Sequence, residues 1–269
     1  MQSKNKSLRW GKNALLVLVL LGLWSCRGSK VESRWSAQSP VIDGIGEEWP
    51  GQSLEFDDDL ELAYGISNNK EVLSVMFRFA DQRLARRMER LGFTLWLNPD
   101  QDEDRDFGLY YCDPAVVGRP GAWREESRVA RAEAAQQARP EPSGRFFMIQ
   151  KDTVDLPHGG MHGLEAAVGY HGGFYCFEYR IPLGPDNGYS LEVTPGKPVK
   201  LGFVLSGLSD DQQDEMRDRM EEDREVFSTG MEEPMGSPGR RRSMGGRFGN
   251  MRSLLEEREM WVTVKLSEK

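Results

Sequence analysis

The chain has 269 residues, a formal net charge of -8, and 38% hydrophobic residues. This length can bury one sizeable core, and we expect one domain with large insertions. An acidic chain is a poor binder of phosphate backbones, so nucleic acid is not an expected partner.

The first 25 residues have the layout of a secretory signal peptide. The apolar run 14–23 is too short for a comfortable membrane span, and it follows four basic residues, Lys4, Lys6, Arg9 and Lys12. The next motif, "LWSC", resembles the lipobox of bacterial lipoproteins, with Trp24 at a position that is usually small. The resemblance implies cleavage before Cys26 and acylation of that cysteine. A soluble exported protein and an uncleaved anchor are the alternatives.

By the same resemblance, Arg27 in place of Asp indicates sorting to the outer membrane. We expect a lipid-anchored protein of the bacterial cell envelope, with residues 26–39 as a tether and residues 40–269 as the folded domain.

The middle of the chain alternates apolar and polar residues with a period of two, which predicts strands. The segments 59–66 and 73–80 form an expected hairpin around Asn68-Asn69, and His171-Gly172-Gly173 closes a second hairpin. Further strands are expected in "FTLWLNP", "FGLYYC", "RFFMIQ", "LEAAVGY", "FYCFEYRIPL", "VKLGFVLSG" and "MWVTVKL".

One short helix is expected after Asp81, which can cap it, and Gly92 should end it. About nine strands with one helix predict an all-β fold, an antiparallel β-sandwich of jelly-roll or immunoglobulin-like type. Two charged insertions interrupt it. Residues 114–143 predict a surface helix between breakers, and residues 209–252 predict a solvated helix followed by a disordered Met- and Arg-rich stretch.

The expected folded part opens with Ile42-Asp43-Gly44 and Glu48-Trp49, and continues with "VLSVMFRFAD", "LGFTLWLNPD", "FEYRIPL", "VKLGFVL" and "WVTVKL". These short motifs resemble the carbohydrate-binding module family 9-like (DOMON-like) domains. The resemblance covers residues 40–208 and 259–266. It implies that Asp43-Gly44 makes the first turn and that Trp49 packs at the edge of the sandwich.

Two cysteines, Cys112 and Cys176, remain if Cys26 carries lipid. An oxidising compartment would allow them to pair. A disulfide and two buried thiols are equally compatible with the sequence, because spacing along the chain does not give the distance between them.

Catalytic and metal-binding motifs are not evident. His158 and His162 are four residues apart, but Pro157 and the neighbouring glycines predict a loop, so we expect no metal there. The acidic runs 100–106 and 57–59 are solvated turns by the same logic, although family 9 modules can carry structural calcium and an ion at either run remains an alternative. No nucleophile elbow, P-loop or Rossmann motif occurs, so we expect neither an enzyme nor a cofactor.

The resemblance favours a non-catalytic domain that binds polysaccharides or oligosaccharides by aromatic stacking. Alternation places Trp96 and Trp261 on the non-core face of their strands, and Trp123 follows a loop, so these three are the candidate sugar-binding residues. Burial of Trp96 and Trp261 under other parts of the chain is the alternative for both. An envelope assembly protein that binds a partner through residues 209–252 is the alternative function, and a hydrolase is a third.

Overall fold

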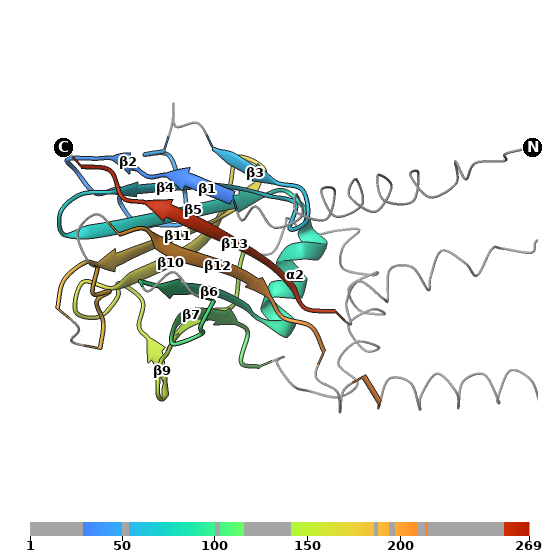
Figure 1. The fold of residues 1–269 in the computed structure, drawn as a ribbon. Coiled ribbons are helices and arrows are strands. Elements are labelled where there is room, and N and C mark those ends of the chain that lie inside the picture. The colour runs from blue at the N-terminus through green and yellow to red at the C-terminus, as the bar shows by residue number, and fades with distance from the viewer. Residues whose placement is uncertain are drawn as a thin grey trace, which may run out of the picture.

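The structure is a computed structural model, and it describes residues 29–49, 54–99, 103–115, 141–185, 188–193, 197–208, 213–214 and 256–268. Within these ranges, two stacked β-sheets have a short helix across one end (Figure 1). The expected all-β sandwich is therefore confirmed. The expected signal peptide, Cys26 and nearly all of the two expected insertions lie outside the described residues.

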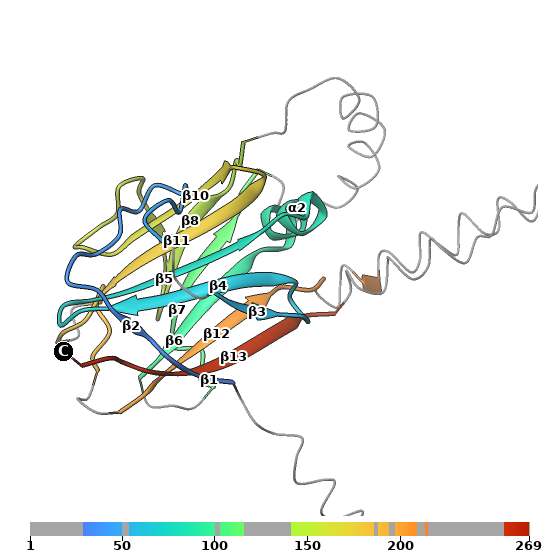
Figure 2. The ribbon, with the colours of Figure 1, turned by 90° about the horizontal axis from the view of Figure 1, so that it is seen from above.

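The seven-stranded sheet has the order β1 (Ser29–Glu32), β13 (Arg258–Lys265), β12 (Val199–Leu205), β6 (Phe93–Asn98), β7 (Phe107–Cys112), β8 (Arg145–Ile149) and β9 (Thr153–Leu156). The six-stranded sheet has the order β10 (Glu165–His171), β11 (Phe174–Pro182), β5 (Val72–Phe79), β4 (Leu62–Asn68) and β2 (Arg34–Trp35), and β3 (Glu55–Asp57) also pairs with β4. Viewed from above, the strands of the two layers lie across one another (Figure 2).

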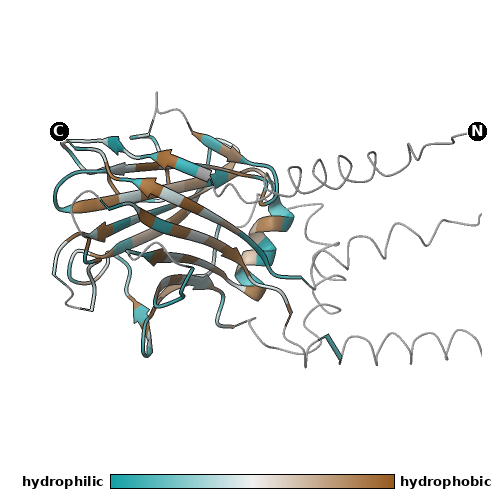
Figure 3. Cartoon of the chain, viewed as in Figure 1, coloured by the Kyte–Doolittle hydropathy of each residue, from teal (hydrophilic) through white to brown (hydrophobic). Residues whose placement is uncertain are grey.

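The core lies between the sheets because successive side chains of each strand point to opposite faces. The alternation of hydrophobic and hydrophilic residues is visible along the strands in Figure 3. Phe77 of β5 is fully buried at the centre, with its ring centroid 4.6 Å from that of Phe177 and 4.7 Å from that of Phe93. Phe93 belongs to the opposite sheet, so this aromatic cluster joins the two layers.

The expected helix and turns are also confirmed. Helix α2 (Gln82–Leu91) begins after Asp81, whose side chain accepts a hydrogen bond from the backbone N–H of Arg83 at 2.7 Å. It ends at Gly92, which has a φ of 96° that a larger residue would adopt only with strain. Gly172 and Gly173 both have positive φ and connect β10 to β11 through a two-residue turn.

The N-terminal part of the described chain differs from the expectation. Residues 29–35 fall within the expected tether 26–39, yet they form β1, which pairs with β13, and β2, which pairs with β4. Both pairings are parallel, so the sandwich is mixed and not purely antiparallel. Neither strand is long enough to show a clear alternation of apolar and polar residues. Each one forms because it pairs with a strand that is distant in the sequence.

Ser33 lies between these two strands, where the chain crosses from one sheet to the other. Its hydroxyl donates to Oδ1 of Asn68 at 2.5 Å, and its backbone N–H donates to the carbonyl of Lys265 at 3.0 Å. Asn68 in turn donates to the carbonyl of Ser267 at 3.1 Å. This buried polar network ties both sheets together at one end of the sandwich.

We expect Phe77→Ala to lower the free energy of unfolding by about 3 to 5 kcal/mol, because it empties the centre of the shared core. Phe174→Ala is the matched control, since Phe174 is 41% exposed and its loss should cost below about 0.5 kcal/mol. Urea denaturation of both variants measures the difference. Similar losses for the two variants would contradict this account of the core.

Candidate functional site

Two of the predicted glycan-binding tryptophans lie in one row on the outer face of the seven-stranded sheet. Trp261 of β13 pairs with Gly202 of β12, and Gly202 pairs on its other side with Trp96 of β6. Gly108 of β7 comes next in the row. Because directly paired residues share a face, tryptophan and glycine alternate across four neighbouring strands.

The glycines let the indole rings lie against the sheet. A Cβ added to Gly202 would lie 2.6 to 2.8 Å from three consecutive atoms of the Trp261 ring. Such nearly equal distances arise from contact with the face of the ring and not with its edge. Trp96 is placed in the same way over Gly108, where an added Cβ would lie 2.7 Å from two ring atoms.

The two rings differ in their access to solvent. Trp96 is only 8% exposed, whereas Trp261 is half-buried. The alternative of burial therefore holds for Trp96, which offers little ring surface for stacking. Trp123 lies outside the described residues, so Trp261 is the accessible ring among the candidates that the structure places.

Charged side chains surround Trp261. The ammonium group of Lys200 lies 5.8 Å from the centre of its ring and also pairs with Glu103 at 2.6 Å. The indole N–H donates to Glu259 at 3.1 Å, and Glu259 pairs with Arg105 at 3.0 Å. The outward-facing aromatic ring thus has hydrogen-bond donors and acceptors on two sides.

A second site lies on the outer face of the six-stranded sheet, where residues 40–49, here called the opening loop, cross the strands. Glu178 of β11 is fully buried beneath this loop. One carboxyl oxygen accepts the backbone N–H groups of Asp43 at 3.1 Å and Gly44 at 2.7 Å, and the other accepts the indole N–H of Trp49 at 2.9 Å. One carboxyl group therefore holds both ends of the loop.

Close packing accompanies these hydrogen bonds. Gly44 has a φ of 79°, and a Cβ there would lie 2.5 Å from backbone atoms of Val168 and Gly169 in β10. Trp49 is 3% exposed and packs with Met76 and Cys176 on this face. Gly44 thus lies at the expected first turn, whereas Trp49 packs on the outer face of the interior strands β5 and β11 and not at an edge of the sandwich.

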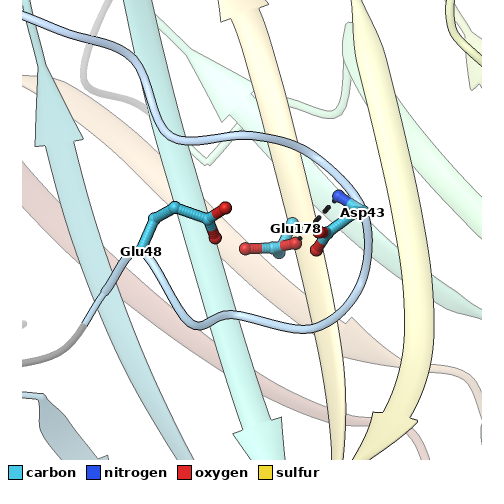
Figure 4. Close-up of side chains that lie close together, drawn as sticks. All are labelled: Asp43, Glu48 and Glu178. Carbon is cyan, nitrogen blue, oxygen red and sulfur yellow. Dashed lines mark hydrogen bonds between the residues drawn. The ribbon is translucent and has the colours of Figure 1, made fainter.

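Burial raises the pKa of Glu178 to about 7, against the lowering effect of its three hydrogen-bond donors, and the nearby Asp43 carboxylate raises it further. Figure 4 shows the Glu178 carboxyl group between the side chains of Asp43 and Glu48, within the bend of the loop. A neutral pH therefore leaves this group partly protonated.

Asp43, Glu48 and Glu178 are also the one group in the described part of the chain with three ligand atoms close enough for a metal ion, within 4.8 Å of one another. Carboxylate oxygens suit Ca²⁺. However, both Glu178 oxygens already accept N–H groups, and Asp43 Oδ1 accepts the N–H of Ile45 at 2.8 Å. The Glu178 carboxyl group is therefore already engaged in the hydrogen bonds that hold the opening loop.

The two acidic runs named as alternative ion sites stay untested. Asp57 Oδ1 accepts the N–H of Leu60 at 2.7 Å in a turn. Residues 100–102 of the acidic run 100–106 lie outside the described residues. His158 and His162 lie in the expected loop, and His162 packs against Tyr189 with ring centroids 4.5 Å apart.

The disulfide alternative is wrong, because Cys112 and Cys176 are both free and buried. Cys112 alternates with the core residues of β7 and Cys176 with those of β11, so the thiols point to opposite outer faces with the core between them. Burial raises the pKa of Cys176 to about 12, helped by the Glu178 carboxylate. This thiol is protonated at neutral pH and a weak nucleophile.

Comparisons with known proteins assign neither a family nor a function to the chain. No model of a protein family matches the chain, and no curated protein is significantly similar to it. Among the described residues, none belongs to a helix with the length and apolar character needed to cross a membrane.

We expect Glu178→Gln to lower the free energy of unfolding by about 1 to 3 kcal/mol near neutral pH, because an amide nitrogen cannot accept the N–H groups that face it. The free energy of unfolding of the variant should also lack the pH dependence that Glu178 contributes. The folded pKa of Glu178 lies above the unfolded value of 4.5, so its contribution to stability is present below pH 4.5 and lost as the pH rises through about 7.

Urea denaturation between pH 4.5 and 8 tests this. Glu71→Gln is the control, since Glu71 is exposed and should keep the wild-type pH profile. A wild-type profile in Glu178→Gln would show that another group titrates.

Proposed function

We propose that this chain is a lipid-anchored protein of the bacterial cell envelope whose β-sandwich binds glycans without catalysis, as a member of the family 9-like carbohydrate-binding modules. The observation that carries the proposal is the Trp261 indole, which lies face-down on Gly202 and is half-buried on the outer face of the seven-stranded sheet. A pyranose ring has an apolar face of C–H groups that packs well on such a surface.

The surroundings of Trp261 support glycan binding in a second way. Glu259, Arg105 and Lys200 provide acceptors and donors beside the ring, and sugar hydroxyls need both. Their present partners are other exposed side chains, so a hydroxyl could replace a partner at little cost.

Contacts between the motifs of the resemblance support the proposed family assignment. Asp43-Gly44, Trp49 and the Glu of "FEYRIPL" belong to three separate parts of the resemblance, and hydrogen bonds join all of them at Glu178. A shared structural role for these residues supports the assignment. These contacts concern the fold of the domain. The specificity for a glycan would depend on the surface at Trp261.

We expect Trp261→Ala to weaken glycan binding by about 1 to 2 kcal/mol while the domain stays folded. Calorimetry of the purified full chain against soluble plant and microbial oligosaccharides measures the loss, with circular dichroism as the check on folding. Phe174→Ala is the control, because it removes an exposed aromatic ring from the other sheet. Trp96→Ala should act mainly on stability, and Trp123→Ala tests the remaining candidate.

The glycan proposal fails if no oligosaccharide binds at millimolar concentration or if Trp261→Ala binds as the wild type does. The first result would favour the alternative of an envelope assembly protein. Loss of a co-purifying partner on deletion of residues 209–252 would support that alternative.

The anchor has its own test. Cys26→Ser should move the protein to the soluble fraction or leave an unprocessed precursor, because the acyl chains would contribute about 0.8 kcal/mol per buried methylene to membrane binding. Fractionation and the mass of the mature N-terminus report the result. A variant that stays with membranes and is cut at the same bond would contradict acylation at Cys26.

A further inference from the structure

A cleft of about 420 Å³ opens beside the opening loop on the outer face of the six-stranded sheet. Its floor is apolar and consists of Trp49, Leu54, Met76 and Cys176. Sites for small molecules range from roughly 300 to 1,000 Å³ and are lined mainly by such side chains. The volume therefore suits a compound with about one ring.

Two walls of the cleft expose apolar side chains to solvent. Ile45 of the opening loop and Phe174 of β11 are each 41% exposed. A ligand in the cleft would cover these two side chains as well as the apolar floor. Binding would therefore remove additional apolar surface from water.

Arg78 of β5 is the cationic group of the cleft. The side chain is exposed, and the structure gives it no hydrogen bond or ion pair with any described residue. Its guanidinium carbon lies 5.1 Å from the centre of the Phe174 ring, which restricts its orientation. A restrained guanidinium with free donors is suited to bind a carboxylate through two parallel hydrogen bonds.

Two polar side chains, Glu47 and His171, also line the cleft, and Glu47 Oε1 lies 3.3 Å from Nε2 of His171. Both side chains could bind hydroxyl groups of a ligand.

We propose that this cleft binds a small ring carboxylate, with the carboxylate on Arg78 and the ring against Ile45 and Leu54. The site is separate from the glycan surface at Trp261, since it lies on the other sheet. Glu178 acts as a positioning residue, because its hydrogen bonds hold Asp43, Gly44 and Trp49 and so set the wall that carries Ile45.

A ring carboxylate could be an aromatic acid or a sugar acid, and the test separates these sources. Benzoate and glucuronate are titrated into the full chain and followed by ligand-observed NMR, with benzamide and glucose as their neutral counterparts. At least one of the two acids should bind more tightly than its neutral counterpart. The acid that binds more tightly shows whether the natural ligand is an aromatic acid or a sugar acid.

Arg78→Gln should weaken binding of that acid by at least about tenfold, the loss expected for a charged hydrogen-bonded pair. Arg83→Gln is the matched control on the exposed side of α2, and Trp261→Ala is the control for the glycan surface. Neither should change the affinity. Phe174→Ala should weaken it, since Arg78 would lose the ring that orients it.

The proposal is overturned if neither acid binds at about 10 mM, or if Arg78→Gln binds as tightly as the wild type. It is also overturned if Arg83→Gln causes the same loss, because the attraction would then come from net charge. Failure of the glycan test leaves these results unaffected, and the Trp261→Ala arm shows which surface a given ligand uses.

Discussion

The packing of two sheets on one aromatic core decides which side chains of this protein can meet a ligand. Phe77 stacks on Phe177 of its own sheet at 4.6 Å and contacts Phe93 of the opposite sheet at 4.7 Å between ring centroids. Each strand must turn one face toward this cluster, since its side chains alternate with a period of two. Every residue between two core positions is thereby placed on an outer face.

The outer faces carry different chemistry as a result. On the seven-stranded sheet, glycines alternate with Trp96 and Trp261. Because the glycines have no side chain, the indole rings can lie against the strands. Of the two rings, only Trp261 is partly accessible to solvent. On the six-stranded sheet, the opening loop covers the strands and leaves a cleft with a restrained Arg78 beside it. A cleft of this kind suits a compact ligand with one charge.

Glu178 connects the second site to the stability of the fold. A carboxyl group with no exposed surface is costly in its charged form, and its three donors offset only part of that cost. The same hydrogen bonds position the loop that forms one wall of the cleft. One residue therefore contributes both to the pH dependence of the free energy of unfolding and to the position of the loop.

The amino-acid sequence alone determined the main elements of the domain. Alternation in segments such as 73–80 predicted the strands, Asp81 and Gly92 predicted the limits of the helix, and alternation placed Trp261 on an outer face. These features depend on residues close together in the chain, and local geometry is enough to predict them.

The tertiary structure decided the remaining features, because they depend on distances between remote residues. The burial of Trp96, the separation of Cys112 from Cys176, and the pairing of residues 29–35 all follow from which strands lie side by side. The glutamate of "FEYRIPL" was visible as a motif, but its contact with residues 43–49 spans more than 120 positions. No local pattern encodes such a contact, since it forms only when the sheet brings both segments together.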